Sequence, residues 1–162
     1  MLKRYGAEIS LRGGHPERPD MLGLSEPFTD LRRLPEAYEQ SKTAVQAAAV
    51  DPQIGPLSEY RDTGVYQFLA TGKGGLPGRS VNFADLQEQD RNAELLPVLE
   101  LLYDTDGSVA DVAAQLHLHR SSVYNRLARV RSIIGADPLK GRVRLELHLA
   151  MKAARWAGRP RL

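Results

Sequence analysis

The chain has 162 residues, of which 42% are hydrophobic, so one domain is the default and two small ones are possible. It contains no cysteine, which excludes a disulfide scaffold and a thiolate metal site and fits a reducing compartment. The N-terminal residues MLKRYGAEISLRGG lack the apolar run of a signal peptide, and no later window resembles a membrane span. We therefore expect a cytoplasmic protein that makes no contact with membranes.

The small net charge of +2 hides an asymmetry between the two parts of the chain. Residues 1–107 contain 11 Lys or Arg against 17 Asp or Glu, whereas residues 108–162 contain 11 against 3. A basic C-terminal part of this kind is the electrostatic pattern of a module that binds phosphate groups.

Residues 1–70 show a mixed α/β pattern. Short apolar runs predict strands at 21–25 and 57–60, and apolar periodicity predicts helices at 34–50 and 62–70. Pro35 falls in the first turn of the longer helix, where its missing N–H costs little. Two strands and two helices cannot enclose a large core, so we expect a partner chain or a swapped element to cover the sheet edge.

Helical spacing also predicts which side chains of these two helices are buried. In the first helix they are Ala37, Tyr38, Ser41, Ala44, Val45 and Ala48, and in the second they are Val65, Phe68 and Leu69.

The segment from Thr71 to Val81, TGKGGLPGRSV, separates the two parts of the chain. It holds four glycines and one proline without apolar periodicity, which indicates a linker. A phosphate-binding loop does not fit, because neither Ser nor Thr follows Gly72-Lys73 and the P-loop spacing is absent. The predicted division is a partial α/β segment at 1–70, a Gly-rich linker at 71–92 and a helical domain at 93–162.

After the linker the pattern is helical throughout. A leucine-rich helix is predicted from Ala93 to Asp104, and Asp106-Gly107 ends it. Ser108 followed by Asp111 resembles a capping box that begins the next helix. The buried faces of the first and last helices are expected to hold Leu95, Leu96, Leu99, Leu102 and Tyr103, and then Leu145, Leu149, Ala153 and Trp156.

The segment SVADVAAQLHLHRSSVYNRL has the spacing of a helix-turn-helix. The residues Val109, Val112, Ala113 and Leu116 form one apolar face, and Val123, Leu127, Val130 and Ile134 form a second one. A three-residue turn at 117–119 joins the two helices, and Gly135 ends the second. The outer face of that second helix is then free to enter a DNA major groove.

Residues in the turn and along the outer face of the second helix are the candidate DNA contacts. Arg120 is expected to bind guanine and Asn125 to bind adenine, each with two hydrogen bonds. Either Ser121 or Ser122 could cap the helix, and Ser122 could also donate to a phosphate. The complete candidate set is His119, Arg120, Ser121, Ser122, Tyr124, Asn125, Arg126 and Arg129, with Arg131 as a further phosphate candidate.

No other motif indicates chemistry. His117 and His119 form an H-x-H, but no cysteine or carboxylate pair completes a metal site. His15 and His148 stand alone in the sequence, and no catalytic triad or carboxylate pair can be argued. We expect no catalytic residues, no metal and no cofactor, and hence a protein that is not an enzyme.

The run ELLPVLELLYDTDGSVADVAAQLHLHRSSVYNRLARVRSIIGAD, with the following LELHLAMK helix, resembles the C-terminal DNA-binding domain of PucR/CdaR-type bacterial transcription regulators. The matching features are Asp106-Gly107-Ser108, Ala113-Ala114, His119 to Val123, Arg126-Leu127 and Gly135. The resemblance covers about a third of the chain, and it implies a regulator that binds double-stranded DNA as a homodimer and responds to an unknown effector.

The segment DMLGLSEPFTDLRRLPEAYEQSKTAVQAA resembles the end of the degenerate GGDEF-like domain that precedes the helix-turn-helix in that family. The GG[DE]EF signature is absent, and Gly13-Gly14-His15 does not replace it, so the resemblance does not imply cyclase activity. Family members are usually longer, which implies a truncated member or a fragment.

The sequence therefore predicts an α+β protein with a small partial α/β piece followed by an all-α helix-turn-helix domain. The predicted function is sequence-specific DNA binding, with the helix from about 120 to 133 in the major groove. Two alternatives remain: a protein–protein interaction module, and a nucleotide-sensing domain with a basic helical tail.

Overall fold

The computed structural model describes residues 4–12, 20–72 and 80–162. The fold has two compact units, one formed by residues 1–76 with 152–162 and the other by residues 77–151. Within the described residues, a small three-stranded sheet and seven α-helices confirm the predicted α+β class. The Gly13-Gly14-His15 segment and most of the Gly-rich stretch at 71–81 lie outside the described residues.

The sheet in the first unit has three strands in the order β1-β2-β3. β1 (Glu8–Leu11) pairs antiparallel with β2 (Met21–Leu24), and β3 (Leu57–Glu59) pairs parallel with β2. The prediction of two strands was incomplete, because β1 was missed. Its sequence EISL alternates as a strand should, but four residues are too few for the alternation to stand out.

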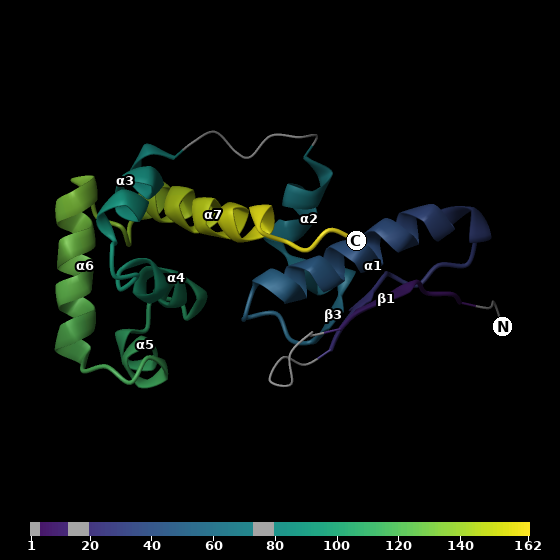
Figure 1. The fold of residues 1–162 in the computed structure, drawn as a ribbon, viewed down its shortest axis with the longest axis horizontal. Coiled ribbons are helices and arrows are strands. Elements are labelled where there is room, and N and C mark those ends of the chain that lie inside the picture. The colour runs from purple at the N-terminus through teal and green to yellow at the C-terminus, as the bar shows by residue number, and fades with distance from the viewer. Residues whose placement is uncertain (1–3, 13–19, 73–79) are drawn as a thin grey trace. The chain divides into compact units, whose positions relative to one another are not determined.

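Helix α1 (Leu34–Val50) follows the short 3₁₀ helix η1 (Leu31–Arg33) and has the predicted bounds. It packs on the sheet, as Figure 1 shows, and it approaches β2 closely at Gly23. A Cβ at that position would collide with the carbonyl oxygen of Ser41 and the backbone amide of Val45. The glycine is therefore required by the close approach of helix and strand.

Two predicted core residues of this unit are exposed. Tyr38 keeps 48% of its surface exposed and Phe68 keeps 77%. The error at Phe68 arose because residues 60–63 form the 3₁₀ helix η2 (Tyr60–Thr63) and α2 (Val65–Thr71) begins only after Gly64. The shifted helical phase places Tyr66 inward instead, with 1% exposure.

The first unit has a small apolar cluster formed by Ala47, Tyr66 and Trp156. The rings of Tyr66 and Trp156 lie 5.6 Å apart between centroids. Trp156 is therefore a core residue, as predicted, but its buried partners belong to the α/β unit rather than to the helix-turn-helix. The chain segment after Met151 thus completes the unit that residues 4–72 begin.

The second unit is helical. It contains α3 (Val81–Gln89), α4 (Leu96–Asp104), α5 (Val109–Gln115), α6 (Arg120–Ile134) and the first part of α7 (Gly141–Ala157). Helix α3 lies within the stretch that was expected to be a linker, and its Leu86 is fully buried. The largest buried side chains of this core are Leu86, Leu95, Leu99, Leu102, Tyr103, Leu127, Leu147 and Met151.

Helix α7 corrects the predicted buried face of the last helix. Leu145 is 69% exposed, whereas Leu147 and Met151 join the core of the second unit. Ala153 and Trp156 are buried as predicted, so the error is confined to the first half of the helix, where Leu145, Leu147 and Leu149 offer several equally good helical alignments. Among the described residues, no helix is both long enough and apolar enough to cross a bilayer.

Candidate nucleic-acid interface

Helices α5 and α6 pack through the apolar side chains that the sequence spacing selected. Val112 and Ala113 of α5 are buried against Val123, Leu127 and Val130 of α6, within one continuous core. Ser108 caps α5, because its Oγ accepts a hydrogen bond of 3.2 Å from the backbone N–H of Asp111. The two helices therefore form a stable unit that presents the second helix at the surface.

The turn between these helices is closed by backbone hydrogen bonds. The N–H of Leu118 donates to the carbonyl of Ala113 at 2.8 Å, and the N–H of His117 donates to Ala114. This pair of hydrogen bonds requires one residue with a left-handed backbone conformation, and His117 supplies it with a φ of 52°. The turn fixes the angle at which α6 leaves α5.

Helix α6 begins at Arg120 and is capped by His119 rather than by a serine. The Nδ1 atom of His119 accepts from the backbone N–H of Ser121 at 3.3 Å and lies 2.8 Å from the Ser121 hydroxyl oxygen. The His119 ring and the Ser121 hydroxyl therefore share a hydrogen bond whose direction depends on the imidazole tautomer.

The outward strip of α6 is small and uncharged. Ser121, Asn125, Ala128 and Ser132 recur at helical spacing and are all exposed, opposite the buried Val123, Leu127 and Val130. Figure 1 shows one long side of α6 facing α4 and α5 while the other side is uncovered by this unit. Ala128 and Ser132 were not among the predicted contacts, although continuing the same spacing for two more turns would have found them.

Cations lie on both sides of this strip. Helix α6 contains four arginines and no acidic residue. Arg120 and Arg131 share the flank that carries Tyr124, whereas Arg126 and Arg129 share the other. A helix of about 10–12 Å diameter fills a major groove of about 12 Å width, so its two flanks would face the two phosphate walls.

Most of the predicted contact residues are accessible. His119, Arg120, Ser121, Tyr124, Asn125 and Arg129 are exposed, whereas Ser122 and Arg126 are half-buried. Within the described part of the chain, Arg120, Arg126 and Arg129 form no ion pair. Arg131 differs, because its guanidinium lies 3.1 Å from the carboxylate of Asp137.

The end of α6 is fixed by its last residues and the following loop. Gly135 adopts the left-handed conformation with φ of 66°, as the predicted end of the helix requires. The backbone N–H of Leu139 and the guanidinium of Arg131 together hold the pKa of Asp137 below its ordinary value. Asp137 therefore remains ionised at neutral pH and holds the loop against α6.

The sequence indicates no partner for His148, but the structure gives it one. Its Nε2 lies 2.9 Å from the Asp104 carboxylate, and its ring packs 5.4 Å from that of Tyr103 between centroids. This pair lies inside the second unit and holds α7 to α4. No group of three or more His, Asp or Glu suited to a metal ion occurs among residues 4–12, 20–72 and 80–162.

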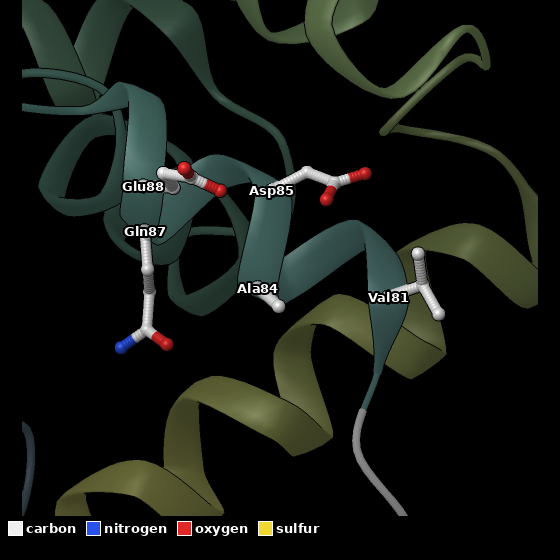
Figure 2. Close-up of a pocket in the computed structure, with 5 residues that line it drawn as sticks. All are labelled: Val81, Ala84, Asp85, Gln87 and Glu88. Carbon is white, nitrogen blue, oxygen red and sulfur yellow. The ribbon is translucent and has the colours of Figure 1, made fainter.

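Two hollows elsewhere on the surface each include two acidic side chains in their lining. Figure 2 shows one on α3, where Asp85 and Glu88 are among five lining residues that all come from that helix. The other lies at the carboxyl ends of β2 and β3 and is lined by Glu26, Glu59 and Arg61 among others, with Arg61 paired to Glu59 at 2.8 Å. Neither hollow offers the free cations that a nucleotide phosphate would need.

The fold and the surface of the second unit define a helix-turn-helix module with a basic, exposed second helix. Comparison with known families gives the same result, because residues 95–153 match the model of the PucR C-terminal helix-turn-helix domain. A domain of this kind indicates a DNA-binding transcription regulator. No curated protein matches the chain.

Proposed function

We propose that this chain is a sequence-specific transcription regulator of the PucR type that inserts α6 into the major groove of double-stranded DNA. The observation that carries the proposal is the outer surface of α6: a strip of small uncharged side chains whose flanks carry arginines, of which Arg120, Arg126 and Arg129 form no ion pair among the described residues. Small polar residues can approach base edges closely, while arginines on the flanks can neutralise phosphates.

The individual contacts follow from position along α6. Residues at the start of a recognition helix meet base edges, and the exposed Arg120 at the first position is long enough to bind the O6 and N7 atoms of guanine. Asn125 lies one turn later on the central strip, where it can bind adenine. We assign Arg126 and Arg129 to phosphates, with His119, Ser121, Ser122 and Tyr124 completing the contact surface.

We also propose that the regulator acts as a homodimer and carries out no catalysis. Two-fold-related copies would present their α6 helices to half-sites about one helical turn apart, roughly 34–36 Å. We further propose that residues 1–70 form a GGDEF-like α/β segment. The Gly23-Leu24-Ser25 end of β2 and the Leu34-Pro35 start of α1 support that assignment.

Selection of bound sites from random double-stranded DNA with the purified chain tests the proposal. Enrichment of a two-fold-symmetric site is expected. Binding to that site should weaken steeply with salt, with a slope of about −0.9 for each phosphate neutralised. A slope near zero would instead favour a surface for a protein partner, and failure to enrich any site would contradict sequence-specific binding.

Substitution of Arg120 tests the base contact. Arg120→Ala should weaken binding to the selected site by about 1–3 kcal/mol and relax the base preference at one position, with folding unchanged. A uniform loss across all sequences would reassign Arg120 to a phosphate. Arg12→Ala is the matched control, because it removes one exposed arginine from the first unit and should leave binding unchanged.

A further inference from the structure

An exposed arginine outside the helix-turn-helix lies beside the recognition helix. Arg91 follows α3, and it lines one hollow together with Arg129 of α6 and with Glu88 and Gln89. The hollow is built inside the second unit, where α3 packs against α6. Two guanidinium groups from different elements thus border the same space.

No acidic side chain is paired with either of these two arginines among the described residues. Across the described residues, the side chain of neither Arg91 nor Arg129 forms an ion pair or a hydrogen bond, even though Glu88 lines the same hollow. Arg131 on the opposite flank does pair with a nearby carboxylate. Two unpaired cations beside one carboxylate leave an excess of positive charge, which an anion bound in the hollow would neutralise.

The position of the hollow identifies the anion. Arg129 belongs to the flank of α6 that also carries Ser122 and Arg126, so the hollow continues that flank towards α3. A helix seated in the major groove has a sugar–phosphate wall along each flank. A phosphate of that wall is therefore the anion that lies within reach of Arg129 when α6 is bound.

We infer that Arg91 and Arg129 together bind one backbone phosphate of the DNA beside the recognition helix. This inference rests on the proposed function, and it extends the DNA contacts to a residue outside the matched 95–153 domain. Glu88 would weaken this contact through its charge, so the same hollow contains two residues that favour the phosphate and one that opposes it.

Salt-dependent binding of the full chain to its selected site tests the inference. The double variant Arg91→Ala/Arg129→Ala removes both arginines from the phosphate and should lower the magnitude of the slope of log K against log salt by about 0.9, and Arg91→Ala alone should lower it by less. Between 50 and 200 mM salt, the affinity ratio of wild type to the double variant should therefore shrink about 3- to 4-fold. Arg91→Lys keeps the charge and should retain the wild-type slope, and Glu88→Gln should tighten binding about 2- to 5-fold.

The outcomes separate this inference from the function on which it rests. A near-zero slope for the wild-type chain would reject DNA binding itself. A steep wild-type slope that Arg91→Ala leaves unchanged, while Arg129→Ala lowers it, would overturn only the role of Arg91. Binding of free inorganic phosphate that Arg91→Ala abolishes without changing the DNA slope would identify a small-anion site and also overturn the inference.

Discussion

The Lys152 ammonium lies 2.9 Å from Oδ2 of Asp51, a residue 101 positions earlier in the chain. Both side chains are buried, with exposures of 8% and 4%, and the hydroxyl of Tyr66 donates to the same carboxylate oxygen at 2.8 Å. Burial alone would raise the pKa of Asp51, but hydrogen bonds from Lys152 and the backbone N–H of Gln53 outweigh it, so that pKa lies below its ordinary value.

Removal of one partner should destabilise the first unit strongly. Lys152→Met leaves the Asp51 carboxylate buried without its cation, and we expect a loss of about 3–5 kcal/mol. Chemical denaturation followed by the fluorescence of Trp156, the only tryptophan, measures the loss. Lys42→Met is the control, because the exposed pair of Lys42 with Glu39 should contribute under about 1 kcal/mol.

The same pair predicts how stability depends on pH. The folded pKa of Asp51 is lower than its unfolded pKa of about 3.9, so its stabilisation is fully present above that unfolded value. The stabilisation is lost as the pH falls through the folded pKa. Thermal unfolding between pH 7 and pH 2 should show this loss in the wild type and a smaller one in Asp51→Asn. The same decrease in melting temperature with falling pH in both proteins would contradict this role of Asp51.

Asp90 supports the start of α4 and should be essential to the second unit. Its carboxylate accepts from the backbone N–H groups of Glu94, Leu95 and Leu96 at 2.8–3.1 Å and is itself buried. Asp90→Ala leaves these donors unsatisfied and should cost about 2–3 kcal/mol in urea unfolding. Asp85→Ala, on the neighbouring α3, should change stability by under about 0.5 kcal/mol; equal losses would reject the role of Asp90.

His117 carries a left-handed backbone that glycine adopts without strain. His117→Gly should therefore stabilise the second unit by about 0.5–1 kcal/mol, after allowing for the greater unfolded-state entropy of glycine. Ala114→Gly, at an exposed position of α5, should instead destabilise it by about 1 kcal/mol. Thermal unfolding should show a raised melting temperature for His117→Gly and a lowered one for Ala114→Gly. A lowered melting temperature in both variants would refute the strain at His117.

Gly23 should not tolerate a side chain. Gly23→Ala must push α1 away from β2 and should cost about 3 kcal/mol or more, detected by loss of the Trp156 signal at lower denaturant. Gly55→Ala is the matched control, because the nearest atom to its added Cβ is a carbonyl oxygen 3.9 Å away. Similar unfolding midpoints for both variants would show that helix and strand can separate without cost.

Local sequence patterns predicted the helix-turn-helix well because its determinants are close together in the chain. The spacing of Val112, Val123 and Leu127 selects the buried faces, and Ser108 and Gly135 mark helix ends through their own backbone and side-chain chemistry. The cap of α6 was missed because a histidine, rather than a nearby serine, supplies the acceptor.

What the sequence by itself determined is the helical module, its basic surface and the bounds of α1, since each depends on residues within a few turns of one another. Only the tertiary structure decided where Trp156 and Lys152 pack, which face of α7 is buried, and that Arg91 lies beside Arg129. Those relationships join residues far apart in the chain, and helical periodicity does not specify which distant surface a face will meet.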